Sequence, residues 1–377
     1  MPEGQLLVAT KGRIGFLRQT DFNTPQTTDT SFDYFAFTGV DLTPVQGQNV
    51  LPPEAGNEPL PRGMFKTGIH VAGGVDLIPR LSDRFGWLLE AAFGDASSYT
   101  DQTVAQVIAA AGATPGVNAH LFGFQDADSF YLPYLTAHRL MPANLAADEV
   151  GEVFQDCRIA GFTLTANAAA VVTSRFDLLG RASGATVWDV NPGWSQPTYD
   201  DDSAFAVTSC LGEFKASVTG GTPGTLTAFD VRQITLTVAN AMLPPDRSRR
   251  IGNPHPKDFP VLSRNIGISA VLMLEDYDLY VQTFGGPANP VVDTAWSCIP
   301  LDGDIDFTLQ SPAEIAATGE YYLFRFRTTA GNVKLMARPI VLMPNEPVLM
   351  QVQGTIARPS TGRAFYAYLQ NATLSYD

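Results

Sequence analysis

The chain has 377 residues, of which 45% are hydrophobic and 16% are charged, enough apolar material for the core of one large or two ordinary domains. Its 24 Lys and Arg residues stand against 38 Asp and Glu residues, and the net charge of -14 argues against sequence-independent binding to nucleic acid or anionic lipid. The N-terminal residues show no apolar signal-peptide core, and no segment approaches the ~18 apolar residues of a membrane-spanning helix. We therefore expect that the chain is made in the cytoplasm and does not associate with membranes.

A segment rich in proline and glycine comes early in the chain. Residues 41–63, DLTPVQGQNVLPPEAGNEPLPRG, contain five prolines and three glycines. This composition predicts a long loop or extended arm without regular secondary structure. Loops of this length are often functional or bound to a partner.

The next segment predicts one amphipathic helix over residues 81–94, LSDRFGWLLEAAFG. Ser82 is a candidate N-cap and Gly94 a candidate C-terminal stop. One apolar stripe follows the helical period, and its members are Leu81, Phe85, Leu88, Leu89, Ala92 and Phe93. A second, weaker helix is predicted from Thr103.

From about Val150 onward the dominant period is two, which predicts antiparallel β structure. Residues 161–180, GFTLTANAAAVVTSRFDLLG, read as a hairpin, and residues 234–242, ITLTVANAM, repeat nearly the same letters. The predicted core positions are Phe162, Leu164, Phe176, Leu178, Ile234, Leu236 and Val238. The opposite face would carry Thr163, Thr165, Thr173, Arg175, Asp177, Thr235 and Thr237. Further strands are predicted within residues 265–284, 321–328, 333–343, 347–358 and 363–376. The expected fold class is mainly β (α+β), an antiparallel β-sandwich or barrel with one flanking helix.

The repeated letters have two interpretations. Strands of similar burial can converge on Thr-Leu-Thr through β propensity alone. Alternatively, the hairpins are duplicated and the subunit carries two equivalent ribbon units. We therefore expect residues 1–149 to hold the N-terminal strands, arm and helix and residues 150–377 the long hairpins, either as one intertwined domain or as two equivalent halves.

Motifs of catalysis and cofactor binding are missing from the sequence. It contains no GxxxxGK[ST], GxSxG or HExxH pattern, and its four histidines are far apart. The acidic stretch DGDID at residues 302–306 lacks the distal Glu of an EF-hand loop, which favours a solvated turn over a calcium site. The three cysteines, Cys157, Cys210 and Cys298, are expected to be buried thiols. We predict no enzyme, no metal site and no cofactor.

A basic stretch, DRSRRIGNPHPK at residues 246–257, stands out in this acidic chain. It reads either as a solvated connector between strands or as a docking loop for an acidic surface on another subunit. In the second case Arg247, Arg249, Arg250 and Lys257 would make the contacts.

The order of these features resembles the tail tube (major tail) proteins of long-tailed bacteriophages. After the arm, residues 63–94 are similar to the family's strand, glycine turn and single helix, and residues 120–136, HLFGFQDADSFYLPYLT, to its Leu-Pro-x-Leu-Thr strand. Residues 154–181, 229–242 and 354–377 are similar to the later strands. The chain is long for the family, and insertions are expected near residues 95–118 and 182–209.

The resemblance implies a structural virion protein of the tail, whose hairpins join those of other copies in a β-barrel around a DNA channel. The polar positions given above would then face the channel, and an overall negative lumen would keep DNA from sticking. Its partners would be further copies of itself, in rings of six or, with a duplicated ribbon, of three, together with tape measure and tail terminator or tip proteins. DNA would pass without specific binding. The arm and the basic loop are the candidates for contacts between rings.

Two other function classes remain open. A carbohydrate- or receptor-binding β-sandwich of a tail tip or adhesin would need exposed aromatic side chains around a cleft, and Trp188, Trp194 and Tyr199 are the candidates. An acid-base hydrolase would need two carboxylates in one pocket.

Overall fold

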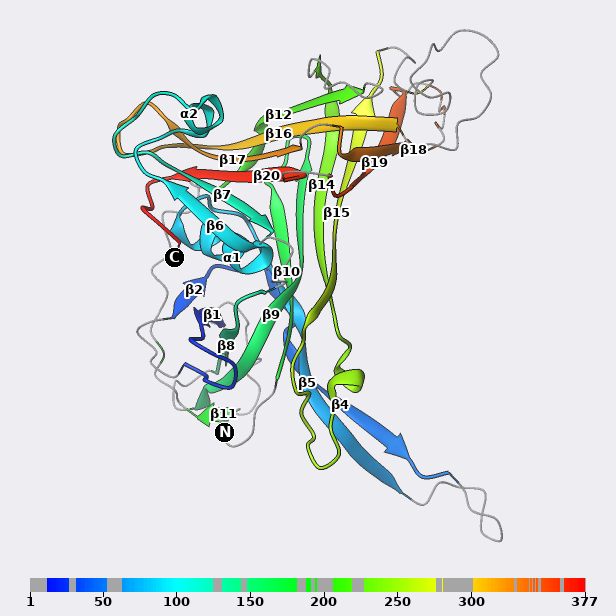
Figure 1. The fold of residues 1–377 in the computed structure, drawn as a ribbon. Coiled ribbons are helices and arrows are strands. Elements are labelled where there is room, and N and C mark those ends of the chain that lie inside the picture. The colour runs from blue at the N-terminus through cyan, green and yellow to red at the C-terminus, as the bar shows by residue number, and fades with distance from the viewer. Residues whose placement is uncertain are drawn as a thin grey trace.

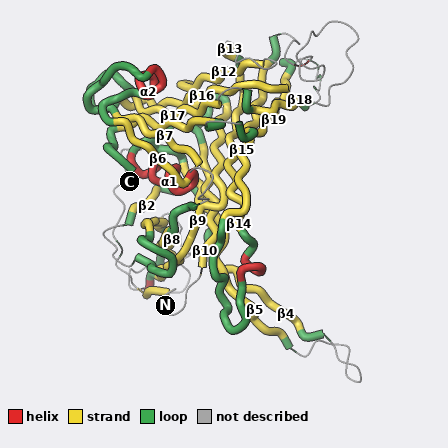
Figure 2. The backbone as a smooth tube through the Cα atoms, viewed as in Figure 1, coloured by secondary structure: helices red, strands yellow, loops and turns green. Residues whose placement is uncertain are grey.

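A computed structural model describes the chain at residues 12–26, 32–52, 63–124, 131–143, 148–181, 188–190, 194, 206–218, 227–275, 280, 301–328, 331–338, 340, 342, 344, 347–359 and 363–376. These residues form a mainly β fold whose strands pair in antiparallel order (Figures 1 and 2). The mainly β prediction is confirmed.

The central sheet is built from strands that come from most parts of the sequence. Its spatial order is β4 (Thr43–Val50), β5 (Met64–Leu77), β10 (Thr173–Arg181), β9 (Val150–Asn167), β14 (Val231–Met242), β15 (Val261–Met273), β19 (Leu349–Ile356) and β18 (Val333–Ala337). The two-residue strand β3 (Gly39–Val40) pairs with the upper part of β5. We call β10, β9, β14 and β15 the central ribbon.

A second sheet crosses the upper part of the molecule in Figure 1. Its order is β13 (Thr227–Ala228), β12 (Thr208–Val218), β16 (Leu301–Glu314), β17 (Tyr321–Thr328), β20 (Phe365–Asn371), β7 (Asn118–Phe124) and β6 (Gly94–Tyr99). Because β18 pairs with both β19 and β16, it joins this sheet to the central one.

A small third sheet lies below, with the order β2 (Asp33–Phe35), β1 (Arg13–Arg18), β8 (Leu135–Met141), the first part of β9, and β11 (Trp188–Val190). The 18-residue strand β9 therefore belongs to two sheets. It pairs with β8 through its first residues and with β10 and β14 through its last ones.

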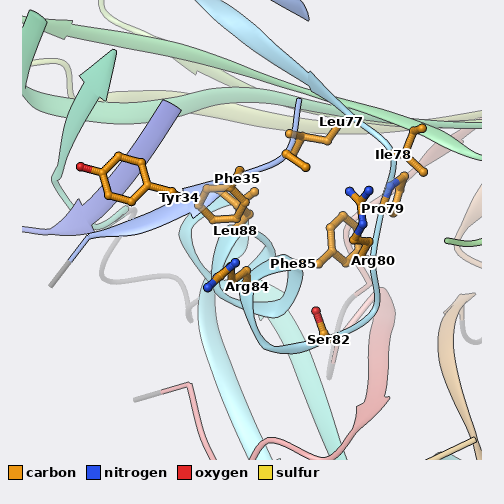
Figure 3. A pocket seen from close by; sticks show the side chains of 11 residues that line it. Tyr34, Phe35, Leu77, Ile78, Pro79, Arg80, Ser82, Arg84, Phe85 and Leu88 are labelled. Carbon is orange, nitrogen blue, oxygen red and sulfur yellow. The ribbon is translucent and has the colours of Figure 1, made fainter. Parts of the chain in front are cut away.

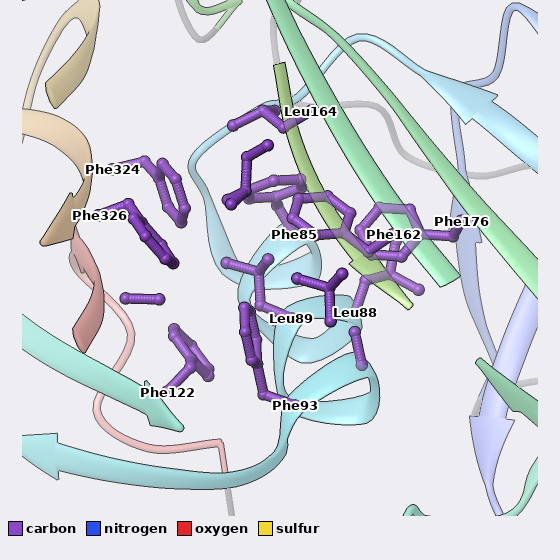
Figure 4. Close-up of a cluster of buried hydrophobic side chains, with 14 of the residues drawn as sticks. Phe85, Leu88, Leu89, Phe93, Phe122, Phe162, Leu164, Phe176, Phe324 and Phe326 are labelled. Atoms are coloured by element: carbon purple, nitrogen blue, oxygen red, sulfur yellow. The ribbon is translucent and has the colours of Figure 1, made fainter. Parts of the chain in front are cut away.

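Helix α1 (Asp83–Phe93) fills the space between the central ribbon and the second sheet (Figure 4). The Phe85 ring centroid lies 6.4 Å from that of Phe162 on the ribbon and 6.4 Å from that of Phe324 on β17. Phe93, about two turns further along the helix, contacts Phe162 and Phe365. The predicted apolar stripe thus packs on both sides, and the helix is a buried central element.

The helix is completed by residues distant in the chain. Tyr376 lies so close to α1 that a side chain at Gly86 would collide with its ring. Gly94 ends the helix in the left-handed conformation, at φ 87°, as predicted. Ser82 occupies the N-cap position, as predicted, and has the extended backbone of an N-cap, but its hydroxyl makes no capping hydrogen bond.

The weaker helix prediction is confirmed as α2 (Val104–Ala109), where Thr103 and Gln106 form a reciprocal capping box. Residues 95–118, expected to be an insertion, contain β6 and α2. Val104 packs there against Leu121 and Tyr368 of the second sheet.

The arm is the main correction to the sequence prediction. Residues 43–50, expected to be irregular, form strand β4, which pairs with β5 in a hairpin that projects from the body (Figure 1). Pro44 is compatible with this because β4 is an edge strand, where a missing N–H costs no ladder hydrogen bond. The prolines at 53, 59 and 61 lie outside the described residues.

No helix among the described residues has the length and apolar character needed to cross a membrane.

Candidate assembly surface

The central ribbon has one buried face and one open face. All seven predicted core positions, from Phe162 to Val238, are buried; the most exposed of them, Ile234, has a relative exposure of 8%. The intervening residues point the other way. Thr173 and Thr237 are exposed, and Thr163, Thr165 and Thr235 are half-buried. The period-two pattern therefore specifies the two faces, since a shift of one residue would exchange them.

The two similar sequences pair with each other. In the register of β9 and β14, Thr163 lies opposite Thr237, Leu164 opposite Leu236, and Thr165 opposite Thr235. The two Thr-Leu-Thr triplets are thus related by an approximate twofold axis between the leucines. The hairpins β9–β10 and β14–β15 are the two halves of a single ribbon.

Arg175 is the centre of a charged cluster on the open face. Its guanidinium contacts Asp41 at 2.8 Å, Asp76 at 3.1 Å and Asp177 at 2.7 Å. The three carboxylates, led by Asp41, raise the pKa of Arg175, while the hydrogen bond from Arg175 lowers the pKa of Asp41. One cation among three anions gives this part of the open face a net charge of -2.

The arm, defined here as residues 43–50 and 64–70, carries exposed apolar side chains near its tip. The relative exposures are 61% for Met64, 59% for Phe65 and 54% for Val50. The hairpin continues the direction of β5 beyond the last pairing of β5 with β10, at Val71. An apolar tip on a projecting hairpin is typical of an interaction surface.

The basic loop, residues 243–260, connects β14 to β15 at the same end of the ribbon as the arm (Figure 1). It contains the short 3-10 helix η5 (Pro245–Ser248). Arg247, Arg250 and Lys257 are exposed. Arg249 differs from them: it pairs with Asp246 at 2.9 Å and lies against the arm, where a side chain at Gly68 would collide with its guanidinium. Arg249 thus holds the loop to the arm within one chain.

The base of the basic loop is fixed to the body. Arg158 of β9 donates a 2.9 Å hydrogen bond to the carbonyl oxygen of Phe259 and lies 3.4 Å from the carboxylate of Asp258. The Tyr134 hydroxyl donates a 3.0 Å hydrogen bond to the same carboxylate, and the Arg158 guanidinium lies 3.9 Å from the Tyr134 ring centroid. Burial raises the pKa of Tyr134. These contacts hold the loop in a defined position.

The acidic stretch DGDID is part of strand β16, so the predicted solvated turn is wrong. Asp306 is buried and pairs with Arg325 at 2.6 Å, and Asp302 pairs with Lys334. Asp304 accepts a hydrogen bond from the backbone N–H of Gly331. The period of two that suggested oxygen ligands is here the period of a strand whose carboxylates are satisfied within the sheet.

The described residues contain no group of three or more His, Cys, Asp or Glu side chains placed to hold a metal ion. The cavity between β2 and the start of α1, lined by Tyr34, Phe35, Arg80, Arg84 and Phe85, has a volume of about 40 Å³ (Figure 3). This is room for a water molecule or two, well below a typical ligand site.

The predicted aromatic cleft is wrong for Trp194, which is buried and stacks on His138 at 4.2 Å between ring centroids. His138 stacks on its other side against Phe32. The backbone of Trp188 lies in β11, and Tyr199 and residues 200–202 fall outside the described part of the chain, as does most of the expected insertion at 182–209.

Among the cysteines, Cys157 is buried as expected and Cys210 is exposed. Cys210 lies where the register of β12 against β16 is interrupted, between Thr208 and Glu213, so its side chain is released from the sheet. Cys298 is outside the described residues.

Two surfaces were missed from the sequence. The exposed apolar tip of the arm was hidden by the proline-rich composition, although Met64 and Phe65 directly follow the last glycine of that segment. The groove at the opposite end of the ribbon, described below, depends on a meeting of β12, β13 and β14 that no local pattern encodes.

The fold and these surfaces define a structural, mainly β protein built around a ribbon with one sealed face, with projecting elements at one end. A family model of phage tail tube proteins matches residues 9–337, so the chain belongs to the phage tail tube protein family. Family membership confirms the resemblance inferred from the sequence and makes the chain a non-enzymatic structural component of the virion tail. A search of curated proteins gives no match.

Proposed function

We propose that the chain assembles into closed rings that stack into the tail tube, and that the open face of the central ribbon lines the DNA channel. The observation that carries this proposal is the asymmetry of the ribbon. Its apolar face is sealed within the subunit by α1, and its polar face, with Thr163, Thr165, Thr173, Arg175, Asp177, Thr235 and Thr237, is left open.

An open edge supports lateral assembly. Within the described residues, β19 pairs with β15 only from Gly267 to Met273, so the outer edge of residues 261–266 is available for a strand of another copy. Exposed edges of this kind favour pairing with a further strand. Closure into a barrel removes them and leaves an aqueous lumen when many strands take part.

The pairing of the two similar sequences favours a ring of six. Because β9 and β14 are neighbours in one sheet, the subunit offers one ribbon of four strands, and a trimer would supply only half as many strands as a hexamer. Six copies give about two dozen strands and a barrel backbone roughly 45–50 Å across, at a strand spacing of about 4.8 Å and a tilt of about 35–45°. In this proposal the chain forms one tube domain, in which residues 1–149 supply the arm and helix and residues 150–377 the ribbon.

The channel lining matches the passage of DNA without binding. Threonine hydroxyls are neutral, and the cluster around Arg175 has a net charge of -2. Phosphates would therefore meet no unpaired cation at this point, and non-specific affinity arises from cation-phosphate contacts.

Contacts between rings are assigned in this proposal to the arm and the basic loop, with Arg247, Arg250 and Lys257 as exposed contact residues and Arg249 as their support. The tape measure protein would occupy the channel, and terminator or tip proteins would cover the tube ends. Arginine side chains at the basic end would make stacking sensitive to salt.

Electron microscopy of the purified chain tests the proposal. We expect rings or tubes about 100 Å across, the size of such a barrel with an outer sheet layer. For the lining, we expect Thr237→Cys in a Cys210→Ser/Cys298→Ser background to react in assembled tubes with a small maleimide and to be protected from a maleimide on a polymer wider than the lumen. Ala111→Cys on the outer surface, in the same background, should react with both. Equal reaction of Thr237→Cys with both reagents would contradict the channel assignment.

A further inference from the structure

The ribbon has a projecting turn at one end and a groove at the other. The turn consists of residues 250–253 in the basic loop, where the N–H of Asn253 donates a 3.2 Å hydrogen bond to the carbonyl oxygen of Arg250 and Gly252 has φ 83°. Positive φ at this third position is the mark of a tight turn that favours glycine. Ile251 stands at its tip with a relative exposure of 107%, the exposure of a side chain with no cover at all.

The groove has a volume of about 380 Å³ and lies where the β9–β10 turn, β12, β13 and the start of β14 meet. Its floor includes the buried side chains of Phe214, Ile234 and Leu309. Ala168 stands at its rim, and Leu211, with a relative exposure of 43%, is adjacent to it in the sequence of β12. The groove is thus large enough for a branched side chain, which would meet both apolar and polar groups there.

The turn and the groove are collinear. Strand β14 begins at the groove with Val231 and ends at the basic loop with Met242, and its 12 residues span about 40 Å at the usual rise per residue. Two copies translated along this direction therefore bring the turn of one copy toward the groove of the next. A contact of two different surfaces repeated in one direction makes an open stack.

The charges of the two surfaces are opposite. Arg247, Arg250 and Lys257 lie in and around the turn, and the two carboxylates of the loop are paired, Asp246 with Arg249 and Asp258 with Arg158. Glu213, Asp230 and Arg232 line the groove, which leaves it with a net charge of -1. Asp230 is exposed, whereas Glu213 contacts Lys215 at 2.7 Å. Asp230 is thus the carboxylate best placed to meet a cation from outside.

From these observations we infer that Ile251 of one copy inserts into the groove of a second copy in the adjacent ring, with Arg250 next to Asp230. This inference rests on the proposed stacking of rings and names the receiving surface for the basic loop. Ile251 is the apolar anchor, and Arg250 and Asp230 set the direction of stacking. The fixed base of the loop, at Arg158 and Asp258, means that little order has to be acquired on binding.

Charge exchange tests the inference in the full-length chain. We expect Arg250→Glu and Asp230→Arg each to shorten tubes at least tenfold in electron micrographs and leave single rings intact. The double variant Arg250→Glu/Asp230→Arg should recover tubes, because every subunit then carries both exchanged partners. Lys334→Glu exchanges a cation that belongs to neither surface; although it also breaks the ion pair with Asp302, it should form tubes of normal length and serves as the control.

Cross-linking provides a second readout that does not depend on tube length. In a Cys210→Ser/Cys298→Ser background, Ile251→Cys/Ala168→Cys should give a ladder of covalent multimers on oxidation, whereas Ile251→Cys/Ala111→Cys should remain monomeric. A wild-type chain that forms tubes, combined with normal tubes from both single charge variants and no ladder, would overturn this inference alone. A wild-type chain that forms neither rings nor tubes would contradict the proposed function, and the inference with it.

Discussion

The central ribbon and the arm are both built from antiparallel hairpins, but they differ in the burial of their apolar side chains. In the ribbon, Phe162 and Leu236 are buried against α1 and the second sheet. In the arm, Met64 and Phe65 are about 60% exposed. The ribbon is thus stabilised by its own subunit, whereas the tip of the arm is left uncovered within the subunit, as the proposed contact between rings would need. Substitutions in the two regions should therefore separate folding from assembly.

The largest effect is expected from Leu236→Asp in the ribbon. Leu236 is fully buried between β9 and β15, so a carboxylate there would be desolvated without a partner, which costs several kcal/mol and exceeds what a marginally stable domain can lose. We expect insoluble or unfolded protein by circular dichroism. Leu236→Ala should fold with a loss of about 2–5 kcal/mol.

The matched control is Thr237→Asp, one residue further along the same strand on the open face. Thr237 is exposed, and its change should alter the free energy of unfolding by about 0.5 kcal/mol or less. Similar destabilisation by Leu236→Asp and Thr237→Asp would show that the two faces of the ribbon are not distinct.

In the arm, the double variant Met64→Ser/Phe65→Ser should fold normally and fail to stack. The exposed side chains contribute little within the subunit, so we expect a change of about 0.5 kcal/mol or less in unfolding and rings in place of tubes. Deletion of the whole segment 41–63 should also prevent stacking, but it removes the buried core residue Leu42 and the ion pair of Asp41 with Arg175, so its folding has to be verified first. Tubes of normal length from either variant would refute the assignment of the arm.

A smaller effect is expected at Arg175 on the open face. Arg175→Gln leaves three carboxylates close together, but these groups are partly exposed and screened by water, so the loss should be about 1 kcal/mol or less. The pKa of Asp41 is lowered below 3.8 when Arg175 is present, so the difference between variant and wild type should persist down to about pH 4 and shrink only as the pH falls further. Chemical denaturation at pH 7 and at a pH below 3.8 measures both values.

A pH-dependent effect is expected for His120, which is fully buried on strand β7 of the second sheet. Its Nε2 lies 3.0 Å from both Asn371 Oδ1 and the carbonyl oxygen of Thr373, and burial lowers its pKa below 6.5. Below about pH 6.5 the imidazole of His120 is therefore protonated more readily in the unfolded chain than in the folded chain. The free energy of unfolding should then decrease as the pH falls, by at most about 1.4 kcal/mol per pH unit. His120→Gln should reduce this dependence of stability on pH, as measured by thermal unfolding at several pH values. An unchanged dependence would show that His120 is not its source.

Local patterns predicted the ribbon, the helix and the family, for identifiable reasons. The alternation around Leu164 and Leu236 and the stripe on residues 81–94 are set by burial within the subunit, which leaves a period in the sequence. The arm could not be predicted in this way, because β4 packs no core and its edge position tolerates Pro44. The same holds for Arg249 against Gly68 and for Asp306 with Arg325, since these contacts join segments whose meeting depends on tertiary structure.

The position of α1 has a consequence for the order of events during synthesis. Phe85 emerges from the ribosome early, but its neighbours Phe162, Phe176 and Phe324 follow much later in the chain. Contacts of such large sequence separation form slowly, because a long loop must close first. The ribbon therefore cannot reach its final shape until β17 and β20 are available to cover the helix from the other side. The core is thus complete only when nearly all of the chain has been made, and under the proposed assembly only complete subunits would join a tube.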